Sequence, residues 1–320
     1  MKIAVLDDYQ DCARTLDCFA RLAGHEVLVL NETITEPARL AARLAGVQAL
    51  VLIRERTKVT RELIDLLPEL KIVSQTGRAG PHIDMAACNA RGIVVVAGTG
   101  SPYAPAELTF AMILGAMRGI AHENAALRAG RWQTMLGRTV RGRTLGIFGY
   151  GNIGKLVAQF GKAFGMKVLA FGREGSLERA RADGIDTVAS QRDLFAGSDV
   201  ATVHLRLVPE TRGIVSAQDF AAMPKDALFV NTSRAELVAP GALLAGLAAG
   251  RPAMAAIDVY ESEPTITDPL IAHPNVLAMP HVGYVERDSY ELYLGTAFDN
   301  IVAFANGAPT GVVNPEVLKA

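Results

Sequence analysis

Short runs of Val, Ile, Leu and Ala recur along the chain, and longer segments of helical periodicity lie between them. This alternation is typical of βαβ units, in which helices cover a parallel sheet. In the N-terminal part it predicts strands at 2–6, 26–30, 49–53, 71–75 and 93–95, with helices such as 36–45 and 61–67 between them. We therefore expect an α/β fold.

A passage rich in glycine and proline, 97–105, interrupts this rhythm and precedes a predicted long helix at 106–126. A second series of strands is predicted at 144–148, 167–171, 200–204, 228–231, 253–259 and 276–279. Six such strands match a doubly wound nucleotide-binding sheet. The helical segment 289–306 is expected to return to the first domain, so the sequence predicts two doubly wound parallel-sheet domains.

Charge and composition narrow the class of protein. The 320 residues include 32 Lys and Arg against 33 Asp and Glu, a net charge of −1, and 50% are hydrophobic. Such a chain can bury two cores, but it offers no strong field to nucleic acid or to an anionic membrane. The three cysteines form no CxxC pair, and the N-terminus meets two aspartates before a long apolar run develops. We expect a cytoplasmic protein with reduced thiols and no secretory signal.

The strand at 144–148 runs into Gly149-Tyr-Gly-Asn-Ile-Gly154, and a helix follows. In this setting Gly149 permits the tight turn, Gly151 lets a pyrophosphate approach the backbone, and Gly154 lets helix and sheet pack closely. The amides of Asn152 and Ile153 then hold the negative charge at the helix N-terminus. The alternative is a glycine-rich turn that binds nothing, but the position between strand and helix favours a dinucleotide.

The next strand ends at Gly172, where an acidic residue would take the ribose diol of NAD, and Arg173 is adjacent. Arg206, after the strand at 200–204, can reach the same region. A guanidinium binds a 2′-phosphate, so this pattern favours NADP over NAD. In the alternative interpretation Arg173 points to solvent and Glu174 binds the ribose.

Three ionisable residues follow the last three predicted strands: Arg234, Glu263 and His281. Parallel strands end at one edge of the sheet, so these side chains can converge where the dinucleotide binds. Arginine can grip a carboxylate and polarise a neighbouring carbonyl, histidine can transfer a proton, and a carboxylate can orient that histidine. Singly, each could be a surface charge; together they fit reversible reduction of a 2-oxo acid. No histidine spacing resembles a metal site and no GxSxG elbow is present, so we expect no metal and no serine hydrolase.

The sequence resembles the D-isomer-specific 2-hydroxyacid dehydrogenases over nearly its whole length. This family includes phosphoglycerate and glycerate dehydrogenases and glyoxylate or hydroxypyruvate reductases. The resemblance lies in the glycine turn, in Val230-Asn-Thr-Ser-Arg234, in Ala256-Ile-Asp-Val-Tyr260 with Glu263-Pro264, and in Pro280-His-Val-Gly283.

The resemblance implies a role for each matching residue. Arg234 would bind the substrate carboxylate and keto oxygen, His281 would be the proton donor or acceptor, and Glu263 would support His281. Asp258 would meet the nicotinamide carboxamide. The remaining residues expected to bind the cofactor are Thr232, Ser233 and Gly283.

The resemblance also implies a domain arrangement. A Rossmann dinucleotide-binding domain, 100–285, would be inserted in a flavodoxin-like substrate domain formed by 1–99 and 286–320. The long helix after residue 103 would contribute to a homodimer.

The chain departs from the family pattern at the substrate loop. The family sequence GxGxD, whose amides help hold the substrate carboxylate, appears as Gly77-Arg-Ala-Gly-Pro81, so Ala79 and Gly80 are the expected contacts. Ala235 replaces a glycine after Arg234, Tyr284 replaces a small residue after Gly283, and Arg206 stands where a proline is usual. The identity of the substrate is therefore open.

Two further arginines bear on substrate charge. Arg78 lies in the substrate loop, and Arg54 follows the strand at 49–53 at what should be the same edge of the first sheet. Arg234 already matches one carboxylate, so both would be useful for a second acidic group. In the alternative they pair with Glu55 or Asp84 and hold the loops.

The favoured function is an NAD(P)-dependent reductase of a small 2-oxo acid. A dinucleotide-sensing scaffold without significant turnover is one alternative. A dinucleotide-dependent enzyme of other chemistry, such as formate or phosphite oxidation, is another.

Overall fold

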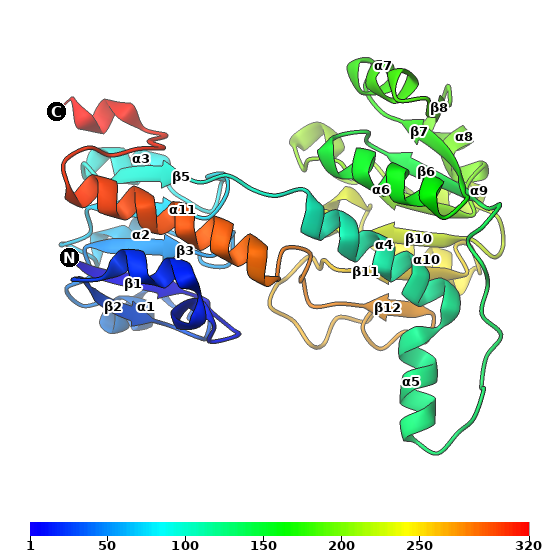
Figure 1. Ribbon diagram of the computed structural model, residues 1–320, viewed down its shortest axis with the longest axis horizontal. Coiled ribbons are helices and arrows are strands. Elements are labelled where there is room, and N and C mark those ends of the chain that lie inside the picture. Colours follow the sequence, from blue (N-terminus) through cyan, green and yellow to red (C-terminus); the bar gives the residue numbers. More distant parts are fainter. Residues whose placement is uncertain (320) are drawn as a thin grey trace. The chain divides into compact units, whose positions relative to one another are not determined.

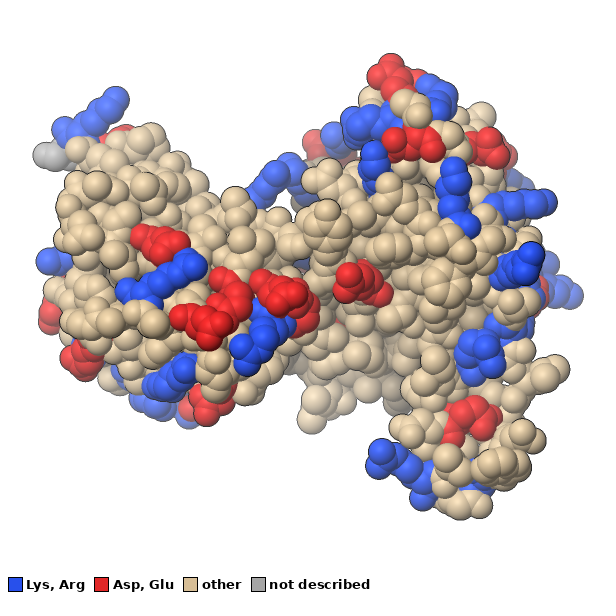
Figure 2. All heavy atoms as spheres, in the orientation of Figure 1, with Lys and Arg blue, Asp and Glu red and all other residues tan. Residues whose placement is uncertain are grey.

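The computed structural model describes residues 1–319, which fold as two compact units, each around its own parallel sheet (Figure 1). One unit comprises Met1–Ser101 and Val285–Ala320, and the other comprises Pro102–Tyr284. On the face drawn in Figure 2, basic and acidic side chains are interspersed, in keeping with the net charge of −1. None of the helices described is long and apolar enough to cross a membrane.

The first unit has five parallel strands in the order β2-β1-β3-β4-β5, the order of flavodoxin-like sheets. The strands are β1 (Lys2–Leu6), β2 (Glu26–Val29), β3 (Ala49–Leu52), β4 (Ile72–Gln75) and β5 (Val94–Ala97). The α-helices are α1 (Pro37–Arg43), α2 (Arg61–Asp65), α3 (Met85–Ala90) and α11 (Arg287–Ala305). The five predicted strands are confirmed, with ends that differ by at most two residues.

Helix α11 belongs to the first unit although it lies near the end of the chain (Figure 1). It packs against β3, β4 and β5, and the hydroxyl of Ser74 on β4 donates to the carbonyl of Ala297 at 3.0 Å. The side chains of Ala297, Phe298 and Ile301 are fully buried. The predicted return of the last helix to the first sheet is thereby confirmed.

The second unit has seven parallel strands in the order β12-β11-β10-β9-β6-β7-β8. The six strands that come first along the chain, β6 to β11, follow the Rossmann order, and β12 adds a seventh at the edge. The seven strands are β6 (Thr144–Phe148), β7 (Lys167–Phe171), β8 (Asp186–Thr187), β9 (Val200–Val203), β10 (Leu228–Asn231), β11 (Met254–Ile257) and β12 (Val276–Ala278). Six of these were predicted. The prediction of six strands was wrong by one because β8 has only two residues and no apolar run.

The helices of the second unit are α4 (Tyr103–Arg118), α5 (Ile120–Arg128), α6 (Asn152–Ala163), α7 (Glu174–Ala182), α8 (Gln191–Ala196), α9 (Ala217–Ala222) and α10 (Ala242–Ala248). The prediction of one helix over 106–126 was wrong. Gly119 adopts left-handed backbone angles (φ +61°) and separates α4 from α5, which points in a different direction (Figure 1). Glycine adopts these backbone angles without the steric cost that other residues pay, so Gly119 is suited to the break.

Candidate active site

In the glycine turn between β6 and α6, two glycines have no room for a side chain and the third faces open space. A Cβ at Gly149, whose φ is +100°, would lie 2.6 Å from the carbonyl oxygen of His204, and a Cβ at Gly154 would lie 2.3 Å from the carbonyl oxygen of Gly149. A Cβ at Gly151 would meet nothing within 4 Å. Packing therefore explains two of the glycines, whereas Gly151 keeps the outer side of the turn free for a ligand.

Helix α6 begins directly behind this turn. Gly151 is its N-cap, and no side chain among the described residues caps its first amides, which include those of Asn152 and Ile153. The turn lies at the switch point of the sheet, because β7 flanks β6 on one side and β9 on the other. Uncapped amides at a helix N-terminus beside an open glycine fit the pyrophosphate of a dinucleotide.

The residues expected to choose the cofactor surround the end of β7. A Cβ at Gly172 would lie 3.7 Å from the Cα of Gly149, so an acidic side chain there would stand beside the glycine turn. Arg173 is exposed, and its guanidinium has no partner within residues 1–319, whereas Glu174 forms an ion pair with Arg181 at 2.8 Å. Arg206 is exposed beyond β9. This geometry leaves Arg173 available to an anion and Glu174 engaged with a neighbour.

The imidazole of His281 and the carboxylate of Glu263 are joined by a contact of 2.5 Å between Nδ1 and Oε2. The other carboxylate oxygen of Glu263 accepts the amide of Tyr260 at 2.8 Å. Burial alone would raise the pKa of Glu263, but the hydrogen bond and charge of His281, the Tyr260 amide and the charge of Arg234 lower it below its ordinary value. Glu263 is therefore held as a carboxylate that orients the imidazole ring.

Asp258 fixes the backbone on the other side of His281. It is fully buried after β11, and its two oxygens accept the amides of Val282 and Gly283, each at 2.8 Å. Burial raises the pKa of Asp258 to about 6, although these two amides and the charge of His281 lower it. The amide of Gly283 is thus bound within the protein, and His281 is held with a left-handed φ of +53°.

Arg234 follows β10 at the same edge of the sheet. Its Nη1 donates to the carbonyl of Ser233 at 2.7 Å, and its own carbonyl accepts the amide group of Asn231 at 2.8 Å. Arg234 is near enough to Glu263 for its positive charge to lower the pKa of that carboxylate. Since Glu263 contacts His281, the structure brings all three residues together in the second unit.

The hydroxyls of Thr232 and Ser233 make contacts within the protein. Thr232 Oγ1 lies 2.7 Å from Thr109 Oγ1 on α4, and Ser233 Oγ donates to the carbonyl of Val203 at 2.7 Å. These bonds tie the end of β10 to α4 and to β9, so both residues hold the wall of the predicted cofactor site in place.

Two tyrosines complete the site and were not assigned a role from sequence. The ring of Tyr284 contacts His281 edge-on, with centroids 5.8 Å apart and planes at 79°. The hydroxyl of Tyr260 donates to the carbonyl of Met279 at 3.0 Å and so joins the ends of β11 and β12. Tyr284 stood out in the sequence as a departure from the family pattern, but its contact with His281 depends on the fold.

The substrate residues expected on the first unit lie after β3 and β4, which are neighbouring strands. Arg54 has a φ of +58°, and its guanidinium carbon lies 5.9 Å from the ring centroid of Tyr293. Arg78 is exposed and forms no ion pair within residues 1–319. Asp84, its possible partner, instead accepts the amide of Ala87 at the start of α3.

Ala79 and Gly80 follow in the same loop. Ala79 packs against the hydrophobic core, and a Cβ at Gly80 would lie 3.2 Å from Nδ1 of His82. Gly80 therefore packs closely against the ring of His82.

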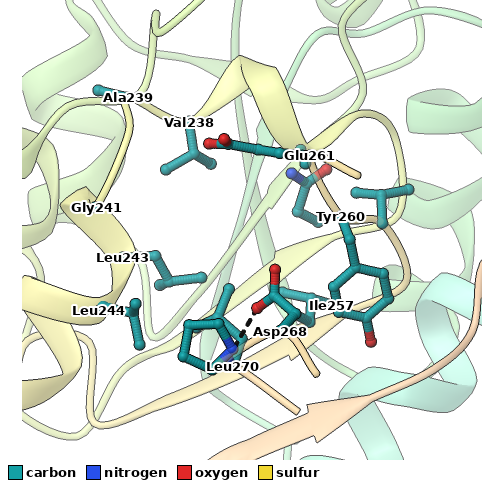
Figure 3. Close-up of a pocket in the computed structure, with 14 residues that line it drawn as sticks. Val238, Ala239, Gly241, Leu243, Leu244, Ile257, Tyr260, Glu261, Asp268 and Leu270 are labelled. Carbon is teal, nitrogen blue, oxygen red and sulfur yellow. Dashed lines mark hydrogen bonds between the residues drawn. The ribbon is translucent and has the colours of Figure 1, made fainter. Parts of the chain in front are cut away.

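A pocket of about 300 Å³ lies beside α10 and the ends of β10 and β11, where Leu243, Asn231 and Ile257 line it (Figure 3). Its walls are mostly apolar, with Tyr260, Glu261 and Asp268 among them, and Asp268 accepts the amide of Leu270 at 2.9 Å. Arg234, Glu263 and His281 do not line it, so it is separate from the candidate active site. Among the described residues no group of His, Cys, Asp and Glu could hold a metal ion.

A protein-family model matches more than half of the chain. The model for the D-isomer specific 2-hydroxyacid dehydrogenase NAD binding domain matches residues 110–283. The chain is 37% identical to the glyoxylate reductase of Aeropyrum pernix over 274 residues, which cover 82% of each chain. It is 34% identical over 262 residues to the D-3-phosphoglycerate dehydrogenase of Bacillus subtilis, and this match covers 81% of the chain but only 50% of that relative.

Solved structures agree with this one over nearly the full length of the chain. An oxidoreductase from Ralstonia solanacearum is 53% identical with a TM-score of 0.97, and the match covers 99% of this chain and 98% of that one. A phosphoglycerate oxidoreductase from Vibrio cholerae O395 is 50% identical with a TM-score of 0.93, and covers 96% of this chain and 100% of that one.

Proposed function

Because the chain belongs to the D-isomer-specific 2-hydroxyacid dehydrogenase family, whose members exchange a hydride between a nicotinamide cofactor and a small 2-hydroxy or 2-oxo acid, we propose that it is a 2-oxo acid reductase. The observation that carries the proposal is the contact of 2.5 Å between His281 Nδ1 and Glu263 Oε2, with Arg234 close by. A scaffold that only senses a dinucleotide has no need of a histidine oriented in this way.

The chemistry follows from the orientation of the imidazole. A carboxylate can only accept, so Nδ1 of His281 carries a proton, and Nε2 is the atom that exchanges a proton with the substrate oxygen. Arg234 grips the substrate carboxylate and polarises the keto group. The bound nicotinamide supplies the hydride. Glu263 offsets the positive charge of His281 before the proton is transferred.

For the cofactor we propose NADP in preference to NAD. The support is the absence of an acidic side chain at Gly172, the available guanidinium of Arg173 and the ion pair that engages Glu174. Arg206 is a second cation for the 2′-phosphate. The pyrophosphate would bind at the turn that includes Gly151, and the nicotinamide near Thr232, Ser233, Asp258 and Gly283.

For the substrate we propose a 2-oxo acid with a second negative group. Arg54 and Arg78 on the first unit are the cations that support this proposal, and the loop with Ala79 and Gly80 would hold a carboxylate. We assign 1–99 and 286–320 to the substrate domain and 100–285 to the dinucleotide domain. A phosphoglycerate dehydrogenase and a glyoxylate reductase are both relatives, so substrate charge has to be measured.

We also propose a homodimer formed through α5 and the segment after it. Four large apolar side chains are exposed there: Ile120 (59%), Leu127 (57%), Trp132 (76%) and Leu136 (95%). Large exposed apolar side chains are frequent where a protein contacts a partner. Light scattering should give a dimer mass for the wild type and a monomer mass for Leu136→Asp with Trp132→Asp.

The three thiols, at Cys12, Cys18 and Cys88, are free, which supports the cytoplasmic location that we propose. The deciding experiment for the function is a panel of 2-oxo acids assayed with NADPH and NADH by absorbance. Reduction of at least one acid supports the proposal. Dinucleotide binding without turnover of any acid would favour the scaffold, and oxidation of formate or phosphite would favour the other chemistry.

A further inference from the structure

We propose that the buried pair Gln75 and His82 positions Arg54 to bind the second negative group of the substrate. This inference rests on the proposed function and assigns to the pair a role in substrate selection. Gln75 and His82 would be positioning residues, since they act through Arg54.

Gln75 ends β4 and is 1% exposed. Its Nε2 donates to two carbonyls, those of Arg54 at 3.0 Å and Thr76 at 2.9 Å. Its Oε1 lies 2.8 Å from Nε2 of His82. The side-chain amide is therefore fully used, and its orientation is fixed by three partners.

The hydrogen bonds also fix the proton on His82. Both donors of Gln75 go to carbonyls, so its oxygen must accept, and His82 must carry its proton on Nε2. Nδ1 of His82 is buried and has no partner among the described residues. Burial lowers the pKa of His82, with the positive charge of Arg54 lowering it further, although Glu55 acts in the opposite direction. A neutral His82 is thus a fixed donor to Gln75.

Arg54 needs this support because its backbone is in the left-handed region, with φ at +58°. Residues other than glycine rarely adopt this region without compensating contacts. The amide of Arg54 donates to Thr76 Oγ1 at 2.8 Å, and its carbonyl accepts from Gln75. Thr76 therefore fixes the backbone amide of Arg54, and Gln75 fixes its backbone carbonyl.

The strained backbone sends the guanidinium over the substrate loop. A Cβ at Gly77 would lie 2.3 Å from Nη1 of Arg54, so the guanidinium covers the first residue of the loop 77–81. The guanidinium carbon of Arg54 also lies over the ring of Tyr293, 5.9 Å from its centroid. If Arg54 relaxed to ordinary backbone angles, its guanidinium would leave this position. The protein would then bind substrates with a second negative group more weakly.

The test compares oxaloacetate with pyruvate, two 2-oxo acids that differ by one carboxylate. The variants are Gln75→Met, which keeps the size but removes the hydrogen bonds, His82→Leu, Arg54→Ala, and the double variant Gln75→Met with Arg54→Ala. As a matched control, Asn314→Leu removes another buried amide of the same unit, which bonds to Val95, Ile93 and Asn89.

We expect Gln75→Met and His82→Leu to lower the ratio of kcat/KM for oxaloacetate over pyruvate at least tenfold, through KM for oxaloacetate. The double variant should lose no more than Arg54→Ala alone, because the pair acts through Arg54. His82→Gln, which keeps a donor near the position of Nε2, should restore most of the ratio. Asn314→Leu should lower the melting temperature and leave the ratio unchanged.

Calorimetric binding of malonate and acetate gives a readout that does not depend on turnover. An unchanged selectivity for malonate in folded Gln75→Met or His82→Leu, with selectivity lost in Arg54→Ala, would overturn the inference. If either variant fails to fold, the other decides. If wild-type protein itself shows no preference for the second anion, the proposed substrate class fails, and the inference fails with it.

Discussion

Asp258 and Gly283 are joined by a hydrogen bond of 2.8 Å between a buried carboxylate and a backbone amide, and the same carboxylate accepts the amide of Val282. The strand β11 is thereby fastened to the turn that carries His281 after β12. A Cβ at Gly283 would lie 3.1 Å from Oδ2 of Asp258, so the lack of a side chain at Gly283 avoids a tight contact with this carboxylate. The imidazole is then fixed by Glu263 on its ring and by Asp258 on its backbone.

The first prediction concerns His281. His281→Ala should lower kcat by about a hundredfold to ten-thousandfold, because proton transfer is lost, and should leave the Kd for NADPH nearly unchanged. Steady-state kinetics and fluorescence titration measure the two quantities. Near-wild-type turnover on an accepted substrate would remove His281 from its proposed role.

The second prediction concerns pH and Asp258, whose pKa burial raises to about 6 from the ordinary 3.8. The native state then binds this proton more tightly than the unfolded state, so Asp258 makes the free energy of unfolding fall as pH rises from about 4 to 6. Protonation also removes one acceptor from the turn of His281, so kcat should fall below about pH 6.

Asp258→Asn tests both parts of this prediction. It should flatten the slope of stability over that pH range and should lower kcat roughly tenfold at neutral pH, since one of the two amides loses its acceptor. Chemical unfolding at several pH values, with matching rate profiles, is the measurement. A slope identical to that of the wild type would contradict the prediction.

The third prediction separates ligand binding from packing in the glycine turn. Gly151→Ala should weaken dinucleotide binding at least tenfold with little change in melting temperature, because its Cβ would meet only open space in the protein. Gly154→Ala should lower the melting temperature by several degrees, because its Cβ would lie 2.3 Å from the carbonyl of Gly149. Unchanged dinucleotide affinity in Gly151→Ala would place the pyrophosphate elsewhere.

The fourth prediction concerns cofactor choice. Arg173→Ala should weaken NADPH about tenfold or more and NADH little, because only NADPH offers a 2′-phosphate to the guanidinium. Arg179→Ala, on the exposed surface of α7, is the matched control and should change neither affinity. Equal losses for both dinucleotides would show that Arg173 does not select the cofactor, and Arg206 would become the residue to test.

The sequence predicted the strands of both sheets well because most are buried apolar runs bounded by turn residues. It failed where structure depends on few residues or on distant contacts. The predicted strand at 253–259 comprises only Met254–Ile257, and the carboxylate of the next residue, Asp258, accepts the amides of Val282 and Gly283. Apolar pattern alone gives no sign of this change.

The candidate site was predicted as a set of residue types at strand ends, and the fold adds their connections. The contact between Glu263 and His281 follows from β11 and β12 being neighbours. The left-handed backbone of Arg54 had no such signal, because it depends on Gln75 and Thr76, which lie 21 and 22 residues away. Long-range hydrogen bonds of this kind are visible only once the sheet order is known.

Gly119, the left-handed glycine between α4 and α5, also makes the rotation of one helix about its axis independent of the other. In a continuous helix each inserted residue turns everything beyond it by about 100°. Gly119 breaks the helix, so the direction of α5 is not set by the helical phase of α4, whose buried face includes Phe110, Ile113 and Met117. Insertions or deletions in α5 should therefore change the reach of this exposed arm while the sheet beneath α4 stays packed.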